Sequence, residues 1–173
     1  MPNYLITGMS GAGKSAVGGA LRDRGLSVLD VDYSDATGWV DAKTLRPAKY
    51  THGDGYEHLR ELLYFWKSEI LVPLLRRGAA SPLPNFFDGY AQNIQSFYPY
   101  FHKMFLLTAD KRSIEHRLLT RTNGDWGKDP AELRQSVEDL ESYQDQLRGA
   151  GAIVIDSAQP LEQIVSEILE LCR

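Results

Sequence analysis

One eight-residue segment near the beginning of the chain constrains its fold and function more than any other. Residues 8–15, GMSGAGKS, match the pattern G-x-x-x-x-G-K-[ST] at every position. Glycines let the backbone curl until successive N–H groups face one centre, and a following helix adds its positive end. The motif therefore predicts a loop that cradles nucleotide phosphates, with Lys14 reaching the β- and γ-phosphates and the Ser15 hydroxyl binding Mg²⁺. The residues expected to contact ATP here are Gly8, Ser10, Gly11, Ala12, Gly13, Lys14, Ser15 and Ala16.

The setting of this motif favours a phosphate-binding loop over a glycine-rich turn with an incidental lysine, because the motif lies between an apolar strand and a helix. Short apolar runs alternate with helical periodicity along the whole chain, which predicts a parallel sheet covered by helices. The expected strands are Tyr4–Thr7, Leu26–Asp30, Asn85–Asp88, Lys103–Thr108 and Ala152–Asp156. The expected helices are Lys14–Arg24, Tyr56–Arg77 with a kink or an earlier end at Pro73, Lys111–Arg121, Pro130–Arg148 and Pro160–Cys172.

Composition narrows the class of protein. The 173 residues, 43% of them hydrophobic, are enough for one domain with a real core. A net charge of −4 argues against a nonspecific nucleic-acid binder, which needs surplus Lys and Arg. The single cysteine, Cys172, forms no internal disulfide, and no apolar stretch approaches the ~20 residues of a membrane span. We therefore expect a cytoplasmic protein, as a monomer or homodimer, with no membrane segment.

The chain contains no Asn-Lys-x-Asp sequence, the guanine-reading element of GTPases, and no ABC-type signature. With the loop at residues 8–15 and this layout, the sequence resembles the small P-loop kinases, a group that includes shikimate kinases and nucleoside-monophosphate kinases such as adenylate kinase. The resemblance covers almost the whole chain in layout and a few motifs in detail. It implies one α/β P-loop NTPase domain over residues 1–173, with a five-stranded parallel sheet of order 2-3-1-4-5, an acceptor-binding region at about 33–100 and a short lid at about 121–129.

Two aspartates at the end of the second expected strand carry part of the resemblance. Residues 29–32, LDVD, are similar to the Asp-x-Asp of shikimate kinases. Two carboxylates at i and i+2 leave a strand on the same face, so Asp30 and Asp32 can point into one cleft. The resemblance implies that Asp30 belongs to the Mg²⁺ shell and that Asp32 receives a hydrogen bond from the acceptor hydroxyl. A pair of solvated loop aspartates is the alternative.

A second similarity begins at Asp88. Residues 86–90, FFDGY, are similar to the Asp-Gly-Phe-Pro-Arg stretch of adenylate kinases, which implies that Asp88 lies beside Mg²⁺ or polarises the acceptor. Where those kinases place the arginine that grips the acceptor phosphate, this chain has Gln92. Glutamine carries no charge to bind a dianion, so we expect an acceptor without a phosphate at this point. Gln92 and Asn93 suit a hydroxyl, an amide or a base edge, or they cap the next helix.

Arg117 and Arg121 share one helical face at i, i+4 spacing. A similar Arg-x-x-x-Arg begins the lid of adenylate kinases, which implies that Arg117 stacks on adenine and that Arg121 clamps the transferred phosphate. A solvated pair of surface arginines is the alternative. Residues 122–128 then form the expected lid, in which Trp126 excludes water and Lys128 follows the phosphates. Residues 33–55 and 122–129 are expected to be mobile loops.

Residues 155–160, IDSAQP, resemble the loop that wraps the adenine in these kinases. This implies contacts from Asp156, Ser157 and Gln159 to the nucleotide; an ordinary strand-to-helix turn is the alternative. The acceptor-binding region holds many aromatic residues, with Tyr64 and Trp66 expected in the core. It also holds six cations, which grip an anionic acceptor or form a solvated face: Lys43, Arg46, Lys49, His52, His58 and Arg60.

Together these features predict an ATP- and Mg²⁺-dependent enzyme that moves the γ-phosphate of ATP to a hydroxyl of a small-molecule acceptor. Its catalytic residues are expected to be Lys14, Asp32, Arg121 and Asp88, with Ser15 and Asp30 on the metal and Asp32 or Asp88 as the base. The alternatives are a regulatory NTPase without an acceptor, a nucleoside or nucleotide kinase, and an RNA or DNA end kinase, against which the acidic balance argues.

Overall fold

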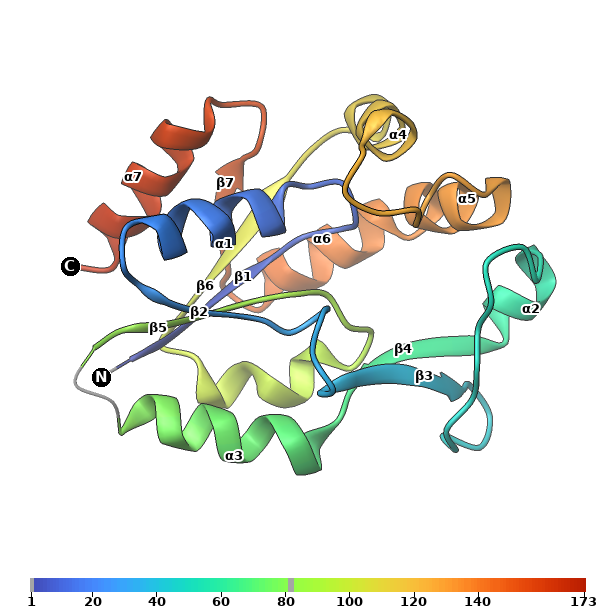
Figure 1. The fold of residues 1–173 in the computed structure, drawn as a ribbon, viewed down its shortest axis with the longest axis horizontal. Helices are drawn as coiled ribbons and strands as arrows, with labels where there is room; N and C mark the ends of the chain where they lie inside the picture. The colour runs from blue at the N-terminus through green and yellow to red at the C-terminus, as the bar shows by residue number, and fades with distance from the viewer. Residues whose placement is uncertain (1, 81–82) are drawn as a thin grey trace.

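The computed structural model describes residues 2–80 and 83–173. Its centre is a parallel sheet of five strands in the order β2-β5-β1-β6-β7 (Figure 1). The strands are β1 (Asn3–Thr7), β2 (Ser27–Asp30), β5 (Asn85–Asp88), β6 (Lys103–Thr108) and β7 (Ile153–Asp156). Counted among themselves along the chain, they lie in the order 2-3-1-4-5, so the predicted fold class is confirmed.

The central strand β1 explains why the sheet needs helices on both faces. All five of its residues are buried, and the apolar ones, Tyr4, Leu5 and Ile6, are at most 2% exposed. A strand buried on both faces reads as a continuous apolar run, which is typical of parallel sheets. Helices α1 (Lys14–Asp23) and α7 (Leu161–Leu171) lie on one side of the sheet and α3 (Ser68–Ala79) lies on the other (Figure 1).

The helix predicted over Tyr56–Arg77 is wrong in its middle. The structure has a short helix α2 (Tyr56–Arg60), a strand β4 (Leu62–Trp66) and then α3, which continues past Pro73 to Ala79. β4 pairs antiparallel with β3 (Thr37–Asp41), so part of the expected mobile loop 33–55 is also a strand. The apolar spacing fits a helix, but the run LLYFW is short and aromatic, and its pairing with β3 decides the conformation.

The helix predicted over Pro130–Arg148 is two helices, α5 (Pro130–Glu138) and α6 (Leu140–Gly149). Asp139 stands between them, and aspartate is a poor residue for a helix interior because its carboxylate competes for nearby hydrogen bonds. Here the carboxylate accepts hydrogen bonds from Arg60 Nη1 at 2.9 and 3.2 Å. The remaining elements are α4 (Lys111–Thr120) and the 3-10 helix η1 (Ile94–Tyr100).

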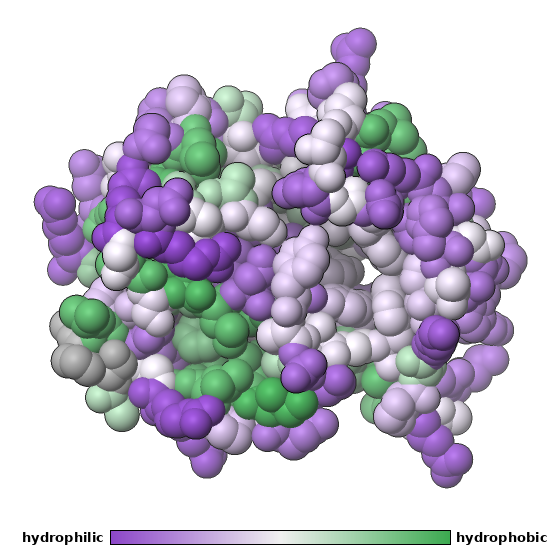
Figure 2. All heavy atoms as spheres, in the orientation of Figure 1, coloured by the Kyte–Doolittle hydropathy of each residue, from purple (hydrophilic) through white to green (hydrophobic). Residues whose placement is uncertain are grey.

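The hairpin β3–β4, α2 and α5 lie at the end of the sheet where its strands finish (Figure 1). The space-filling view shows the molecule hollowed between this group and the body of the sheet (Figure 2). In open α/β sheets this end is where ligands bind. None of the helices in residues 2–80 and 83–173 combines the length and apolar character needed to cross a membrane.

Candidate active site

The loop at residues 8–13 joins β1 to α1 and has the conformation that its glycines predict. Gly13 caps α1 with a left-handed φ of 101°, which disfavours any residue with a side chain. A Cβ at Gly8 would lie 2.6 Å from the carbonyl oxygen of Leu107, so only glycine fits there. α1 begins at Lys14, and the N–H groups of its first turn have no partner within the helix. The local geometry therefore provides backbone donors and the positive end of a helix for an anion.

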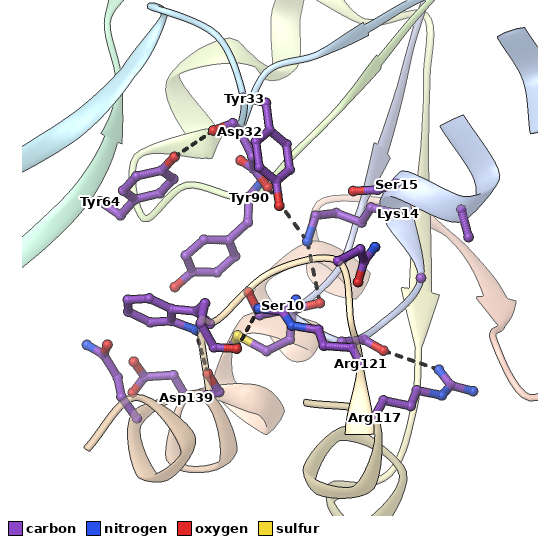
Figure 3. A pocket seen from close by; sticks show the side chains of 18 of the residues that line it. Ser10, Lys14, Ser15, Asp32, Tyr33, Tyr64, Tyr90, Arg117, Arg121 and Asp139 are labelled. Atoms are coloured by element: carbon purple, nitrogen blue, oxygen red, sulfur yellow. Dashed lines mark hydrogen bonds and ion pairs between the residues drawn. The ribbon is translucent and has the colours of Figure 1, made fainter. Parts of the chain in front are cut away.

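A cavity of about 370 Å³ opens over this loop and continues toward the hairpin (Figure 3). At one end it is lined by the glycine-rich loop, Arg117 and Arg121. At the other it is lined by aromatic and polar side chains of the hairpin, the lid segment and α5. The lining residues are Met9, Ser10, Gly11, Gly13, Lys14, Ser15, Ala16, Asp32, Tyr33, Trp39, Tyr64, Tyr90, Gln92, Arg117, Arg121, Asn123, Trp126, Gln135, Ser136 and Asp139.

Lys14 and Asp32 face each other where the two ends of the cavity meet (Figure 3). Lys14 Nζ donates a hydrogen bond to the Gly8 carbonyl oxygen at 2.9 Å and lies 3.8 Å from Asp32 Oδ2. The other carboxylate oxygen of Asp32 accepts a 2.9 Å hydrogen bond from the backbone N–H of Tyr90, which fixes its orientation. Burial raises the pKa of Asp32 to about 6, although Lys14 and the Tyr90 N–H both act to lower it. A carboxylate with this pKa is suited to accepting a proton near neutral pH.

The residues expected to serve Mg²⁺ come from the first turn of α1 and from the end of β2. Ser15 Oγ donates a 3.4 Å hydrogen bond to Asp30 Oδ2, and Asp30 is paired in register with Asp88 on the neighbouring strand. The donors are all oxygen, which suits Mg²⁺; this ion keeps several waters and also binds substrate phosphates. Among the described residues no three His, Cys, Asp or Glu side chains are grouped to hold a metal, so bound Mg²⁺ would need those further ligands.

Asp88 is buried, with 1% of its surface exposed, and within the described part of the chain neither carboxylate oxygen has a hydrogen-bond partner. A Cβ at Gly18 would lie 2.6 Å from Asp88 Oδ2, so α1 passes directly over this carboxylate. Burial, and next the charge of Asp30, raise the pKa of Asp88 to about 7. Asp88 does not line the cavity, and its position beside Asp30 favours the metal side of the two roles considered for it.

Arg121 lines the cavity close to the loop, at the point where α4 gives way to the lid segment (Figure 3). One of its terminal nitrogens donates to the Trp126 carbonyl oxygen, while its buried Nε has no partner among the described residues. A buried guanidinium N–H without an acceptor is costly unless an anion completes it. This geometry is compatible with the predicted phosphate clamp.

Arg117 lines the nucleotide end of the cavity, and its guanidinium group donates hydrogen bonds to other residues of the protein. It donates to Ser157 Oγ and to the Ser157 carbonyl oxygen, both at 2.8 Å, and to the Gly11 carbonyl oxygen at 3.4 Å. It therefore ties the phosphate loop to the 155–160 loop. Asp156 and Gln159 do not line the cavity: Asp156 caps Ala158 N, and Gln159 donates to Glu167. Of this loop only Ser157 is connected to the site, through Arg117.

The hairpin and α5 build the other end of the cavity. Trp39 stacks on Trp126, with ring centroids 5.7 Å apart and planes at 28°, and Trp39 also contacts Tyr64 at 5.1 Å. Tyr64, expected in the core, instead lines the cavity, whereas Trp66 is 1% exposed in the core as expected. Here the sequence reading missed a polar row on α5. The row could have been recognised from the i, i+3, i+4, i+7 spacing of four polar residues that run along α5 to its C-cap. They are Glu132, Gln135, Ser136 and Asp139.

The six cations of residues 43–60 do not line the cavity. Arg60 pairs with Asp139 at 2.9 Å, His52 lies 3.0 Å from Glu132 and His58 lies 3.9 Å from Asp54. Lys128 also stays outside the cavity, 3.2 Å from Asp125.

Gln92 and Asn93 both bind the backbone of β4. Gln92 Oε1 accepts from Tyr64 N at 2.7 Å, and Asn93 Oδ1 accepts from Trp66 N at 2.9 Å. Asn93 makes no side-chain cap of η1, so neither alternative considered for it describes its contacts. Gln92 still lines the cavity, with its amide oxygen engaged on β4.

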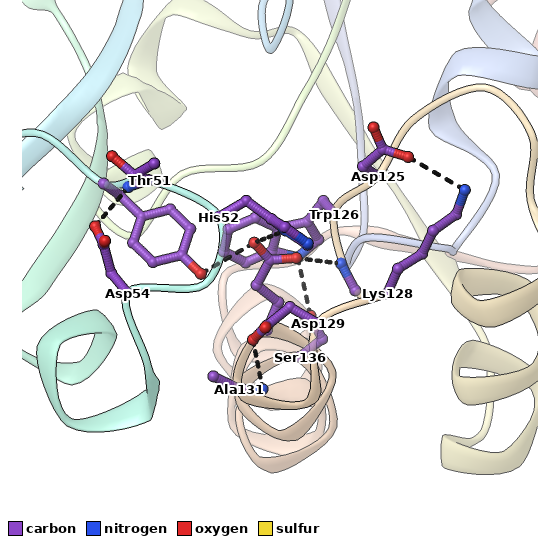
Figure 4. Close-up of polar contacts among 12 residues, drawn as sticks. Thr51, His52, Asp54, Asp125, Trp126, Lys128, Asp129, Ala131 and Ser136 are labelled. Carbon is purple, nitrogen blue, oxygen red and sulfur yellow. Dashed lines mark hydrogen bonds and ion pairs between the residues drawn. The ribbon is translucent and has the colours of Figure 1, made fainter.

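Glu132, at the first turn of α5, joins three segments. Figure 4 shows labelled residues of these segments, His52, Trp126 and Ser136, close to one another. It is 1% exposed, and it accepts hydrogen bonds from Tyr50 Oη at 3.0 Å and from Gly127 N at 2.8 Å, with His52 Nδ1 at 3.0 Å. The hydrogen bond to Glu132 raises the pKa of His52. One buried carboxylate thus holds the loop after β3 and the lid segment against α5.

No protein-family model matches the chain, and neither does any curated protein sequence. Solved structures do match in fold over nearly the whole chain. A sugar kinase from Janibacter sp. HTCC2649 matches at TM-score 0.61 and 20% identity, covering 98% of this chain and 93% of its own. A shikimate kinase from Acinetobacter baumannii, in complex with shikimate, matches at 0.60 and 20%, covering 99% and 93%. A deoxyadenosine kinase from M. mycoides matches at 0.55 and 13%, covering 98% and 97%.

These similarities extend over more than nine-tenths of each of the three structures and of this chain. At 13–20% identity they bear on the arrangement of the backbone, and they agree with the five-stranded parallel sheet and the loop at its centre. The fold that the sequence resemblance implied is thereby confirmed: the chain has the fold of the P-loop kinases.

Proposed function

We propose that this protein is an ATP- and Mg²⁺-dependent phosphotransferase that moves the γ-phosphate of ATP to a hydroxyl group of a small molecule. The proposal rests mainly on one observation: Lys14, Arg121 and Asp32 line the same cavity, with Lys14 Nζ 3.8 Å from Asp32 Oδ2. A nucleotide switch needs the first two groups but has no use for a fixed carboxylate and a second, aromatic end of the cavity. The structures of similar fold are described as kinases of a sugar, shikimate and deoxyadenosine, which supports phosphotransfer.

In this proposal the glycine-rich loop and the start of α1 bind the phosphates of ATP, and Lys14 and Arg121 hold the γ-phosphoryl group. Ser15 and Asp30 would hold Mg²⁺, with the Asp88 carboxyl beside Asp30 on the neighbouring strand. When bound, the ion neutralises charge on the β- and γ-phosphates. Arg117 secures the loop at residues 155–160, where the nucleoside part of ATP would lie.

Asp32 orients the acceptor hydroxyl and receives its proton. The acceptor oxygen forms a bond to the γ-phosphorus while the bond from that phosphorus to the β–γ bridging oxygen breaks, and ADP leaves with the electron pair. Closure of the lid segment 121–129 over the cavity would exclude water and limit hydrolysis of ATP. We place the protein in the cytoplasm, acting on free small molecules as a monomer or homodimer.

The proposal is tested by measuring ADP formation with Mg²⁺ and ATP, first alone and then with a pool of small-molecule alcohols. A kinase is slow until its acceptor arrives, so the pool should raise the rate by about tenfold or more. Lys14→Ala should lower the stimulated rate by about 100-fold or more while circular dichroism stays unchanged. ATP hydrolysis that is equally fast with and without the pool would support a regulatory NTPase instead.

A further inference from the structure

The acceptor end of the cavity differs in charge from its nucleotide end. Of the described residues that line the cavity, the cations are Lys14, Arg117 and Arg121, and all three belong to the nucleotide end. The acceptor end carries the carboxylates of Asp32 and Asp139. Arg60, which pairs with Asp139, lies outside the lining. Asp139 is paired with Arg60 and Asp32 lies 3.8 Å from Lys14, so among the described residues at that end no unpaired cation is left to bind a carboxylate or phosphate of the acceptor.

The walls of this end are flat and aromatic. Trp39 contacts both Tyr64 and Trp126, with ring centroids 5.1 and 5.7 Å apart, and all three line the cavity. The indole Nε1 of Trp126 donates to Ser136 Oγ at 3.1 Å, which fixes the ring against α5. A preformed aromatic wall favours a flat ring in the ligand, because stacking adds to the burial of apolar surface.

One buried polar side chain in this wall has no partner. Gln135 on α5 is 7% exposed and lines the cavity, and its amide makes no hydrogen bond to any described residue. Glutamine presents a donor and an acceptor side by side, and in the cavity lining both are free to pair with a ligand. A ligand edge that offers a matching acceptor and donor would satisfy both groups at once.

We infer that the acceptor is an uncharged alcohol that carries a flat ring with a hydrogen-bonding edge, the chemistry found in nucleosides. The ring would lie against Trp39 and Trp126, its edge would pair with the Gln135 amide, and its hydroxyl would reach Asp32. This assignment of acceptor class rests on the proposed phosphotransferase function and narrows it. Acidic sugars and nucleoside monophosphates are disfavoured, because the described lining residues of this end provide no unpaired cation for their anionic groups.

The test compares three sets of compounds in the ADP-formation assay with the full chain, Mg²⁺ and ATP. The first set contains the common ribo- and deoxyribonucleosides, the second contains gluconate and shikimate, and the third contains the corresponding nucleoside monophosphates. At least one nucleoside should raise the rate tenfold or more and give a phosphorylated product, whereas the two anionic sets should not. Binding of MgATP is measured in parallel by calorimetry.

Gln135→Leu should raise the KM for the active nucleoside about tenfold and leave the KM for ATP unchanged. Gln135→Glu keeps the shape but loses the donor, and should change the order of preference among nucleosides. A merely structural role would instead lower kcat for every nucleoside alike. Gln163→Leu, on the exposed face of α7, is the matched control and should behave as the parent.

Three outcomes separate this inference from the proposed function. Phosphorylation of an anionic compound overturns the acceptor class while the phosphotransferase function stands. Binding of MgATP without phosphorylation of any nucleoside also overturns the acceptor class. Absence of both MgATP binding and transfer overturns the proposed function itself.

Discussion

Asp32 shows how much a single residue depends on its surroundings. Its place in the Asp-x-Asp pattern was visible in the sequence, but its raised pKa follows from burial, which only the fold reveals. The ionised form accepts the acceptor's proton, so kcat/KM should decline as pH falls through about 6. Asp32→Asn should lower kcat by about 100-fold or more with the KM for ATP within about twofold. A collapse of ATP affinity in this variant would place Asp32 in the metal shell instead.

Asp88 leads to a prediction about stability. Its pKa rises from 3.8 in the unfolded chain to about 7, so the folded state keeps a proton that the unfolded chain has released. Its contribution to stability is therefore fully present below pH 3.8 and is lost as the pH rises through 7, with an upper limit of about 4 kcal/mol. In Mg²⁺-free buffer Asp88→Asn should raise the free energy of unfolding at pH 8 by about 1–3 kcal/mol and change it little at pH 4.

Urea unfolding at the two pH values measures this difference. Asp23→Asn, at the exposed last position of α1, is a matched control for the loss of one carboxylate at the protein surface. An Asp88→Asn variant that is equally or less stable than the parent at pH 8 would show that the carboxylate has partners in solution.

At the scale of elements, the lid segment and the loop after β3 depend on α5. Glu132 accepts hydrogen bonds from both, and removing a buried charged acceptor leaves its donors unpaired. Glu132→Ala should therefore lower the free energy of unfolding by about 2–4 kcal/mol. Amide hydrogen exchange at Gly127 should quicken in the same variant, because its N–H loses its acceptor.

Glu141→Ala on α6 provides the comparison, since its ion pair with Lys111 is exposed and should contribute less than about 1 kcal/mol. If the two variants lose similar stability, or if exchange at Gly127 is unchanged, Glu132 does not hold these segments together.

Two features of the helices and strands were not predicted from the sequence. Residues 62–66 carry apolar side chains at spacings that fit a helix as well as a strand, and only their pairing with Thr37–Asp41 settles the matter. The cavity-facing row on α5 was missed because polar residues at helical spacing usually indicate a solvated face. Here Gln135 and Ser136 are buried because the lid segment and the hairpin close over them.

For the whole molecule, the order of the strands in the sheet could be predicted because the motif at residues 8–15 strongly restricts how the chain can fold. A strand, a glycine-rich phosphate loop and a helix leave few ways to add further parallel strands, given short right-handed connections. The nucleotide end of the site was equally accessible, because Gly8–Ser15 is local in sequence. The acceptor end was not, since Trp39 lies far along the chain from Trp126 and Gln135, and only the fold brings it to them. Local sequence motifs thus predict the proposed ATP site better than they predict the acceptor of the phosphate.

The most direct test of the proposed phosphotransfer measures where the γ-phosphate of ATP goes. The full-length protein is incubated with Mg²⁺, ATP labelled on its γ-phosphate and a pool of uncharged ring-bearing alcohols, and the labelled products are separated. We expect a labelled phosphate ester with the parent protein, and almost none with Lys14→Ala or with Asp32→Asn, although the Asp32→Asn variant still binds ATP. Label found only in inorganic phosphate, or an equal yield of ester from Lys14→Ala, would contradict the proposed phosphotransfer.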